Sequence, residues 1–128
     1  MEVARRDGVR TVGFVHDEQK WEALASCEAL IMPSAHESLS IALLEAWSVG
    51  KPVLVSARSK VLVGQCKRSQ GGLWYSDTEE FCAALEYLLQ DATLRRRLGA
   101  QGRHFVAANY DWPRIVEAYR GLISSVAG

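Results

Sequence analysis

Residues 33–56 of this chain read PSAHESLSIALLEAWSVGKPVLVS, and this stretch decides the fold. An apolar run at residues 29–32 comes directly before it and predicts a buried strand that ends at the proline. Residues 41–49 are apolar on every side of a helix except at Glu45 and one serine, which predicts a buried helix. Residues 52–56 then predict a second buried strand. Because a helix joins two buried strands, the stretch indicates an α/β fold with a parallel sheet.

Two glutamates, Glu37 and Glu45, lie on either side of the start of the predicted helix. A buried carboxylate is unfavourable unless it is paired, so we expect a polar group opposite Glu45. Small hydroxyl residues, Ser38 and Ser40, can cap the helix and leave backbone N–H groups free to bind an anion such as a phosphate. The two glutamates are about 12 Å apart along a helix axis. This spacing suits a nucleotide-sugar, which has phosphates in the middle and hydroxyls at both ends.

The stretch resembles the Glu-x7-Glu segment of the family 4 (group 1) retaining glycosyltransferases, which have the GT-B fold. The resemblance extends from a strand entry at residues 9–15 to a helix start at residues 111–112. Between them, residues 50–55 match the family's helix stop and strand, and residues 71–75 match its later glycine-rich strand entry. The resemblance implies a Rossmann-like three-layer parallel sheet, the later part of a GT-B C-terminal domain, followed by C-terminal helices.

The same resemblance implies roles for the residues of the segment. Glu37 contacts hydroxyls of the donor sugar and is the candidate catalytic residue, while Glu45 holds the ribose diol. Backbone amides of Ser38, Leu39 and Ser40 hold the diphosphate of a UDP-, GDP- or ADP-sugar. Many members have Gly-Phe-Gly where this chain has Ser-Leu-Ser, which keeps the amides but removes the close backbone approach that glycine permits. No cofactor is implied, and no Asp-x-Asp metal site is visible.

Three further residues are candidate substrate contacts. His36 lies in the turn before the helix, where it is either solvated or beside the donor sugar. Lys67 and Arg68 fall in a predicted loop after the third strand, at the carboxyl side where open α/β sheets bind ligands; the alternative is a solvated loop. For Glu45 the alternative is a salt bridge with an arginine or a solvated helix edge. For Glu37 the alternative is a loop carboxylate that interacts favourably with the helix dipole.

Composition narrows the class of protein. The 128 residues are 48% hydrophobic and carry 15 basic and 15 acidic side chains, which fits one globular domain and gives no attraction to nucleic acid. The three cysteines are odd in number and lack a Cys-x-x-Cys spacing, which favours a reduced, cytoplasmic setting without a disulfide framework or zinc site. No signal peptide or apolar run of about 20 residues is present, so we expect a soluble chain without a transmembrane segment.

Residues 1–128 are predicted to form a single partial donor-binding domain, with strands and helices alternating in residues 1–75 and mainly helices in residues 76–128. A capping box starts at Ser76, with Glu79 three residues on. The remaining elements predicted are a strand at 9–14, a helix at 17–27, a short helix or turn at 58–64, a strand at 73–75, a helix with an apolar stripe of Phe81, Ala84, Leu85 and Leu88, separate helices at 92–99 and 100–108, and a last helix after Asp111.

Some pieces of the family's donor domain have no match in the chain. These are a first strand–turn–helix that supplies an arginine and a lysine, the next strand and helix, and the N-terminal acceptor domain. If the domain has the strand order 3-2-1-4-5-6, the chain keeps strands 3, 4, 5 and 6. It lacks strands 2 and 1, which separate strand 3 from strand 4 in the sheet. Exposed strand edges then predict a rearranged sheet, an edge-paired or swapped homodimer, or a missing partner segment.

The sequence therefore predicts the nucleotide-sugar-binding part of a retaining glycosyltransferase that transfers a hexose from a nucleotide-sugar donor to an acceptor. Without the arginine, the lysine and the acceptor domain, the isolated chain is expected to be inactive. Two alternatives stay open. One is a non-catalytic nucleotide-sugar-binding or assembly module on the same half-domain, and the other is an unrelated Rossmann-like nucleotide binder.

Overall fold

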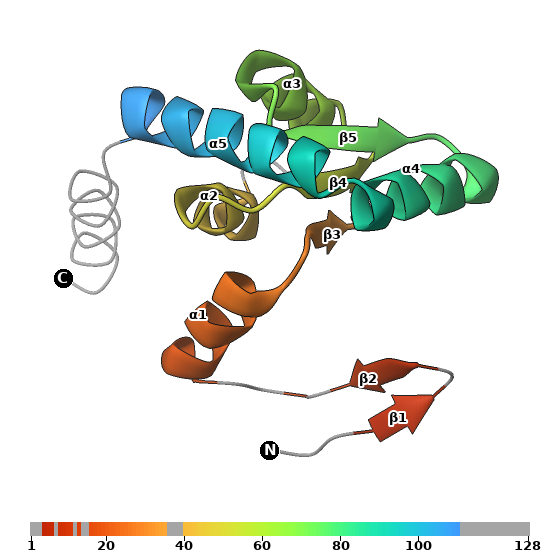
Figure 1. Cartoon of the computed structure of the whole chain (residues 1–128). Coiled ribbons are helices and arrows are strands. Elements are labelled where there is room, and N and C mark those ends of the chain that lie inside the picture. The colour runs from red at the N-terminus through yellow and green to blue at the C-terminus, as the bar shows by residue number, and fades with distance from the viewer. Residues whose placement is uncertain (1–3, 7, 12, 14–15, 36–39, 111–128) are drawn as a thin grey trace, which may run out of the picture.

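Three short parallel strands form the central sheet of the computed structural model (Figure 1). They are β3 (Leu30–Met32), β4 (Val53–Ser56) and β5 (Gly72–Tyr75), and their order in the sheet is β3-β4-β5. The register pairs Ile31 with Leu54, and Leu54 in turn with Leu73. The structure describes residues 4–110 with the exception of residues 7, 12, 14–15 and 36–39. The predicted α/β fold with a parallel sheet is confirmed.

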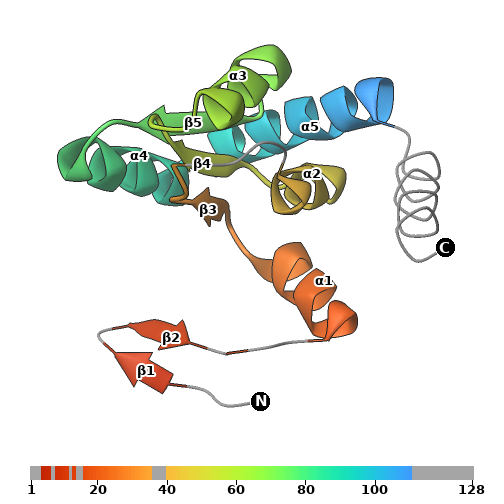
Figure 2. The same cartoon turned by 180° about the vertical axis from the view of Figure 1, so that it is seen from behind.

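The helices that pack on this sheet are α2 (Ile41–Ser48), α3 (Lys60–Ser69), α4 (Thr78–Gln90) and α5 (Ala92–Asn109). α2 and α3 pack with Val53 and Val55, whereas α4 packs with Leu54. Because successive side chains of a strand point to opposite faces, these contacts put α2 and α3 in one layer and α4 in the other. α5 joins both layers, because Leu98 belongs to the same cluster as residues of α4 and Val106 to the same cluster as residues of α2. Figures 1 and 2 show the path of α5 from opposite sides. The expected three layers are present.

The N-terminal segment forms a small sheet of its own (Figure 1). β1 (Ala4–Arg6) pairs antiparallel with β2 (Val9–Thr11), and Gly8 between them has a positive φ of 83° that a tight turn accommodates. The expectation that residues 9–14 add a strand to the parallel sheet is wrong. In the expected strand order, other strands lie between this strand and β3, and the described residues place no strand there. β2 pairs instead with β1, its neighbour along the chain, because a short hairpin closes locally.

Helix α3 is longer than the sequence predicts. A short helix or turn at residues 58–64 followed by a loop was expected, but α3 continues to Ser69. Its N-cap Ser59 accepts a hydrogen bond from the Leu62 amide at 3.2 Å, and Leu62 and Cys66 are buried one turn apart on the face that packs on the sheet. Two buried turns of helix outweigh the single glycine inside it.

The start of α4 lies one residue later than predicted. Asp77 is the N-cap in place of Ser76, and its Oδ1 atom accepts from the Glu80 amide at 2.8 Å. The reciprocal contact is also shifted, because the Ser76 amide donates to Glu80 Oε1 at 2.7 Å. The predicted apolar stripe is confirmed: its members pack in the cluster around Leu54.

Helix α5 is continuous where two helices were predicted. The break was expected at Gly99, but this glycine and Gly102 both lie inside α5. They are glycines because neighbouring atoms leave no space for a side chain at either position. A Cβ atom on Gly99 would overlap the Gly50 carbonyl, and one on Gly102 would overlap the indole of Trp47. Trp47 is fully buried and donates from Nε1 to the Gly71 carbonyl at 3.0 Å. The glycines therefore mark close packing between α2 and α5.

The helix predicted after Asp111 lies outside the described residues. In the part of the chain that the structure describes, no helix combines the length and apolarity needed to cross a membrane.

Candidate functional site

The carboxyl ends of the three parallel strands meet at one edge of the sheet, and three helices begin there. Their N-caps are Ser40, Ser59 and Asp77, and each side chain accepts a hydrogen bond from a backbone amide in the first turn of its helix. This edge is where open α/β sheets bind ligands, and it is the place that the topology gives to a functional site.

Helix α2 begins where the sequence predicts. Ser40 is its N-cap, is 5% exposed, and accepts from the Leu43 amide at 3.2 Å. The amides of Ile41 and Ala42 come before this bond, and no earlier carbonyl of the helix is available to them. The predicted site residues before the cap, His36, Glu37, Ser38 and Leu39, lie outside the described residues.

Glu45 lies in the buried part of α2 and has the polar partner that its burial requires. The residue is 7% exposed, and its Oε2 atom is 2.8 Å from Nζ of Lys20. The hydrogen bond with Glu45 raises the pKa of the Lys20 ammonium, against the effect of desolvation and with a smaller contribution from Asp17. The sequence allowed an arginine in this place, and the structure places a lysine there.

Lys20 reaches Glu45 from α1 (Asp17–Ser26), which precedes the sheet. Leu24, one turn further along α1, is the buried residue of this helix and belongs to the same apolar cluster as Leu43 and Leu44 of α2. Lys20 and Leu24 thus share one face, so the docking of Leu24 carries the ammonium to the carboxylate. Sequence reasoning missed Lys20, although its spacing of four residues from an apolar position was a usable signal.

Lys67 and Arg68 are not in a loop, as the sequence predicted, but in the last turn of α3. α3 starts at the carboxyl edge of the sheet and runs toward the amino edge, so this turn lies far along the helix from Ser59. The Lys67 ammonium turns toward the Trp74 ring, 5.6 Å from its centroid, and lines a cavity of about 280 Å³ on the α3 side. The structure does not join these two residues to Glu45, which has Lys20 as its ionic partner among the described residues.

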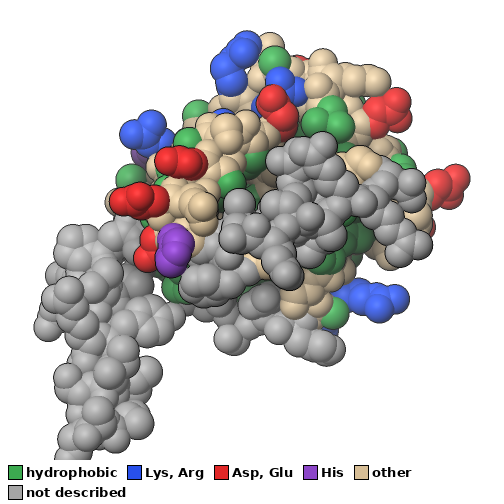
Figure 3. Space-filling model, turned by 90° about the horizontal axis from the view of Figure 1, so that it is seen from below, with side chains coloured by type: hydrophobic (Ala, Val, Ile, Leu, Met, Phe, Trp, Pro, Cys, Tyr) green, Lys and Arg blue, Asp and Glu red, His purple; other side chains and the backbone are tan. Residues whose placement is uncertain are grey.

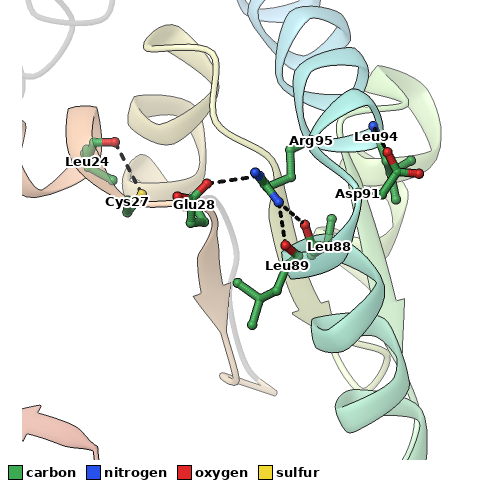
Figure 4. A network of polar contacts seen from close by, with 8 residues as sticks. All are labelled: Leu24, Cys27, Glu28, Leu88, Leu89, Asp91, Leu94 and Arg95. Carbon is green, nitrogen blue, oxygen red and sulfur yellow. Dashed lines mark hydrogen bonds and ion pairs between the residues drawn. The ribbon is translucent and has the colours of Figure 1, made fainter.

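Arg95 has a structural role at the junction of α4 and α5 (Figure 4). Its guanidinium donates to the carbonyls of Leu88 and Leu89 at 2.7 and 2.8 Å and forms an ion pair with Glu28 at 3.0 Å. Arg95 lies near the start of α5, where its guanidinium satisfies two of the last carbonyls of α4.

The described surface carries mixed charge. On the face seen in Figure 3, acidic and basic side chains are interspersed between apolar ones. On the described part of this face, side chains of both charges therefore lie near one another.

Comparisons with known proteins decide the family. A family model described as "Glycosyl transferases group 1" matches residues 2–105. The chain belongs to this family. Its parallel α/β fold is also that of a GT-B domain: it is similar to sucrose-phosphate synthase from Thermosynechococcus elongatus, with a TM-score of 0.72 and 26% identity over 89% of this chain and 30% of that one.

Two curated relatives in the family illustrate its range. One is the lipopolysaccharide core biosynthesis glycosyltransferase LpsE of Rhizobium meliloti, 33% identical over 91% of this chain and 34% of the relative. Another is the MMP alpha-(1->4)-mannosyltransferase of Mycolicibacterium hassiacum, 31% identical over 98% of this chain and 32% of the relative. The chain thus spans about a third of the length of the curated relatives that it matches.

Proposed function

We propose that the chain is the nucleotide-sugar-binding part of a retaining glycosyltransferase that transfers a hexose from a nucleotide-sugar to an acceptor. Membership of the group 1 family supports the transfer chemistry. The observation that carries the binding hypothesis is Glu45, a buried carboxylate on α2 of which one oxygen contacts Lys20.

In this proposal Glu45 binds the ribose diol. Lys20 contacts Oε2, whereas Oε1 receives no hydrogen bond from the residues that the structure describes. A ribose diol offers two O–H donors, and an ionised carboxylate accepts such bonds strongly. The ammonium of Lys20, 2.8 Å from Oε2, fixes the orientation of the carboxylate. The ion pair therefore supports binding by leaving one oxygen open to the ligand.

The start of α2 binds the diphosphate in the same proposal. The amides of Ile41 and Ala42 lie in the first turn of α2, where the helix dipole favours negative charge. The amides of Ser38, Leu39 and Ser40 are assigned to the same anion as a prediction from the sequence. In this proposal Glu37 orients the donor sugar, and His36 contacts the same sugar. As the bond between the anomeric carbon and the diphosphate breaks, negative charge builds on the phosphate oxygens, and the helix start stabilises that charge.

Calorimetry on the 128-residue chain tests the binding. We expect heat of binding with at least one of UDP-glucose, GDP-mannose and ADP-glucose, and none with NAD. Glu45→Gln should weaken that binding by about tenfold or more, because it removes a charged acceptor from a hydrogen bond. Glu86→Gln is the matched control, since Glu86 is an exposed carboxylate on α4 that accepts a hydrogen bond from Gln90.

The outcomes separate the hypotheses. Binding of NAD alone would refute the nucleotide-sugar proposal and favour an unrelated nucleotide binder. We further propose that the chain by itself binds a donor without transferring its sugar, since it matches about a third of the length of its relatives. Release of labelled hexose from the donor at enzymatic rates by the purified chain would contradict that part.

A further inference from the structure

A second cavity lies at the carboxyl edge of the sheet, on the face covered by α4. Its volume is about 510 Å³, within the range of about 300–1,000 Å³ typical of ligand sites. Ile31 of β3 and the last residues of β4 and β5, Ser56 and Tyr75, contribute to its wall. The register pairs Ser56 with Tyr75, so both point to the α4 face, whereas Glu45 lies on α2 in the opposite layer. The cavity is therefore separate from the Glu45 carboxylate.

The wall of this cavity holds polar groups that the described protein leaves unused. Ser56 is 6% exposed, and its Oγ atom accepts from the Arg58 amide at 3.3 Å, but its hydroxyl hydrogen has no acceptor among the described residues. The Arg58 guanidinium also lines the cavity without an ion pair or hydrogen bond to any described residue. Asp77 uses Oδ1 to cap α4, and its second oxygen stays open. Donors and an acceptor thus face the same space.

The charges around the cavity favour an uncharged ligand. Arg58 is the cation of the described wall, and Asp77 places a carboxylate beside it. Glu79 and Glu80 add two more acidic side chains in the first turn of α4. An anion such as a phosphate would meet the Asp77 carboxylate as well as the one guanidinium of the wall, with Glu79 and Glu80 in the adjoining helical turn, which is unfavourable. A neutral ligand with hydroxyl groups can accept from Arg58 and Ser56 and donate to Asp77.

The aromatic part of the wall is rigid. Tyr75 packs edge-to-face on Phe81, with ring centroids 5.0 Å apart and an interplanar angle of 72°. This contact holds the Tyr75 ring in place, so little side-chain entropy is lost when a ligand packs against it. A flat apolar ring next to a few fixed polar groups recognises a molecule with a C–H face and a rim of hydroxyls.

We propose that this cavity is a subsite for an uncharged hexose ring, with Arg58, Ser56 and Asp77 binding its hydroxyls and Tyr75 packing against its C–H face. The proposal rests on the proposed function, because a sugar transferase must hold a sugar from its donor and one from its acceptor. Either source presents the same chemistry to these residues.

Nuclear magnetic resonance of the full 128-residue chain tests the subsite with methyl α-D-glucopyranoside and methyl α-D-mannopyranoside as probes. At least one glycoside should receive saturation from the protein and shift the backbone amides of Ser56, Arg58 and Tyr75 in a saturable manner. Shifts confined to α2, or no saturation transfer at tens of millimolar glycoside, would overturn the proposal.

Variants test the assigned contacts. Arg58→Met should weaken glycoside binding by about tenfold, since it removes a charged donor. Arg58 is exposed and unpaired among the described residues, so the variant should keep its fold. Ser56→Ala should weaken binding by a smaller factor. Arg103→Met is the matched control, because Arg103 is an exposed arginine on α5, away from this edge, and should leave binding unchanged. Equal affinity of Arg58→Met and the unaltered chain would overturn the assignment.

Competition identifies the source of the hexose and keeps the two proposals distinct. If methyl glycoside and UDP-glucose exclude each other while UDP and the glycoside bind together, the subsite holds the donor's hexose. If all three bind together, it holds a sugar of the acceptor. Nucleotide binding without any glycoside binding would reject the subsite and leave the Glu45 proposal standing. Glycoside binding without nucleotide binding would reject the Glu45 proposal and leave the subsite standing.

Discussion

The ion pair between Lys20 and Glu45 allows a quantitative prediction about the stability of the fold. Lys20→Met removes the ammonium but keeps an unbranched apolar stem that can lie along α1 as the lysine does. The carboxylate of Glu45 is then left with 9% of its side chain exposed and without its ionic partner. We expect the variant to be less stable than the unaltered chain at neutral pH.

The size of the effect follows from the exposure of the two partners. Exposed ion pairs contribute about 0.2–1 kcal/mol, whereas removing one partner of a fully buried pair costs about 3–5 kcal/mol. The Lys20 side chain is 41% exposed, so water screens its side of the pair, while Glu45 is nearly enclosed. The expected loss for Lys20→Met is therefore about 1–2 kcal/mol.

The dependence on pH has a defined sign. The folded state raises the pKa of Lys20 above its ordinary value of 10.5, chiefly through the hydrogen bond with Glu45. The ion pair therefore contributes its full stability below pH 10.5 and loses it as the pH rises through the higher folded pKa. The stability difference between the unaltered chain and Lys20→Met should shrink over that alkaline range.

Urea denaturation followed by circular dichroism measures both effects. Asp17→Asn is the control, because Asp17 also lies near Lys20, at 3.8 Å, but its side chain is 92% exposed, and removing its charge should change stability by less than about 0.5 kcal/mol. A double-mutant cycle with Glu45→Gln isolates the pair itself. Equal stability of Lys20→Met and the unaltered chain, or a coupling energy near zero in the cycle, would refute the argument.

Three further changes test the packing. Gly102→Ala should destabilise the fold by about 1–3 kcal/mol in urea despite alanine's better helix propensity, because its methyl would overlap Trp47; a gain in stability would contradict this. Arg95→Met should lower the unfolding free energy by about 1–2 kcal/mol, since it removes two hydrogen bonds and the Glu28 ion pair, and an unchanged urea midpoint would count against it. Burial raises the pKa of Cys66 to about 12, so a disulfide reagent at mildly alkaline pH should label exposed Cys82 quickly and Cys66 only after unfolding; equal rates would show that Cys66 is accessible.

The central strands and helices follow from the sequence where local patterns are strong. The apolar residues of β4 and the nearly uniform apolar run of α2 have no alternative to burial, and Ser40 caps α2 as its residue type predicts. The parallel sheet follows because each buried strand is joined to the next through a helix. For these elements, local propensity and tertiary packing agree.

The errors arise where a distant contact decides the local structure. Gly99 reads as a helix end by its residue type, but the Gly50 carbonyl, far away in the sequence, occupies the space of its side chain. The role of Arg95 likewise depends on where α4 ends, because its partners are the carbonyls of Leu88 and Leu89. The hairpin of β1 and β2 has the same origin, because the strand at Val9 pairs with whichever neighbour the chain supplies.

The candidate site could be predicted in part for the same reason. The burial of Glu45 and its need for a polar partner follow from the pattern of one helix, whereas the identity of that partner depends on how α1 docks. The cavity beside Arg58 and Tyr75 depends on the register of three strands, which no single segment encodes. The residues at 36–39 lie outside the described chain, so their roles stay predictions.

Glu45 must meet two requirements at the same time. As a buried carboxylate it needs a permanent partner, and as a proposed ligand for a diol it needs a free acceptor. A carboxylate has two oxygens, and Lys20 contacts one of them. The structural and functional explanations are therefore compatible, and they separate under mutation: loss of the ammonium should mainly lower stability, while loss of the carboxylate charge should lower nucleotide affinity as well. If Glu45→Gln lowered stability and left the affinity for every nucleotide-sugar unchanged, the ion pair alone would account for the residue.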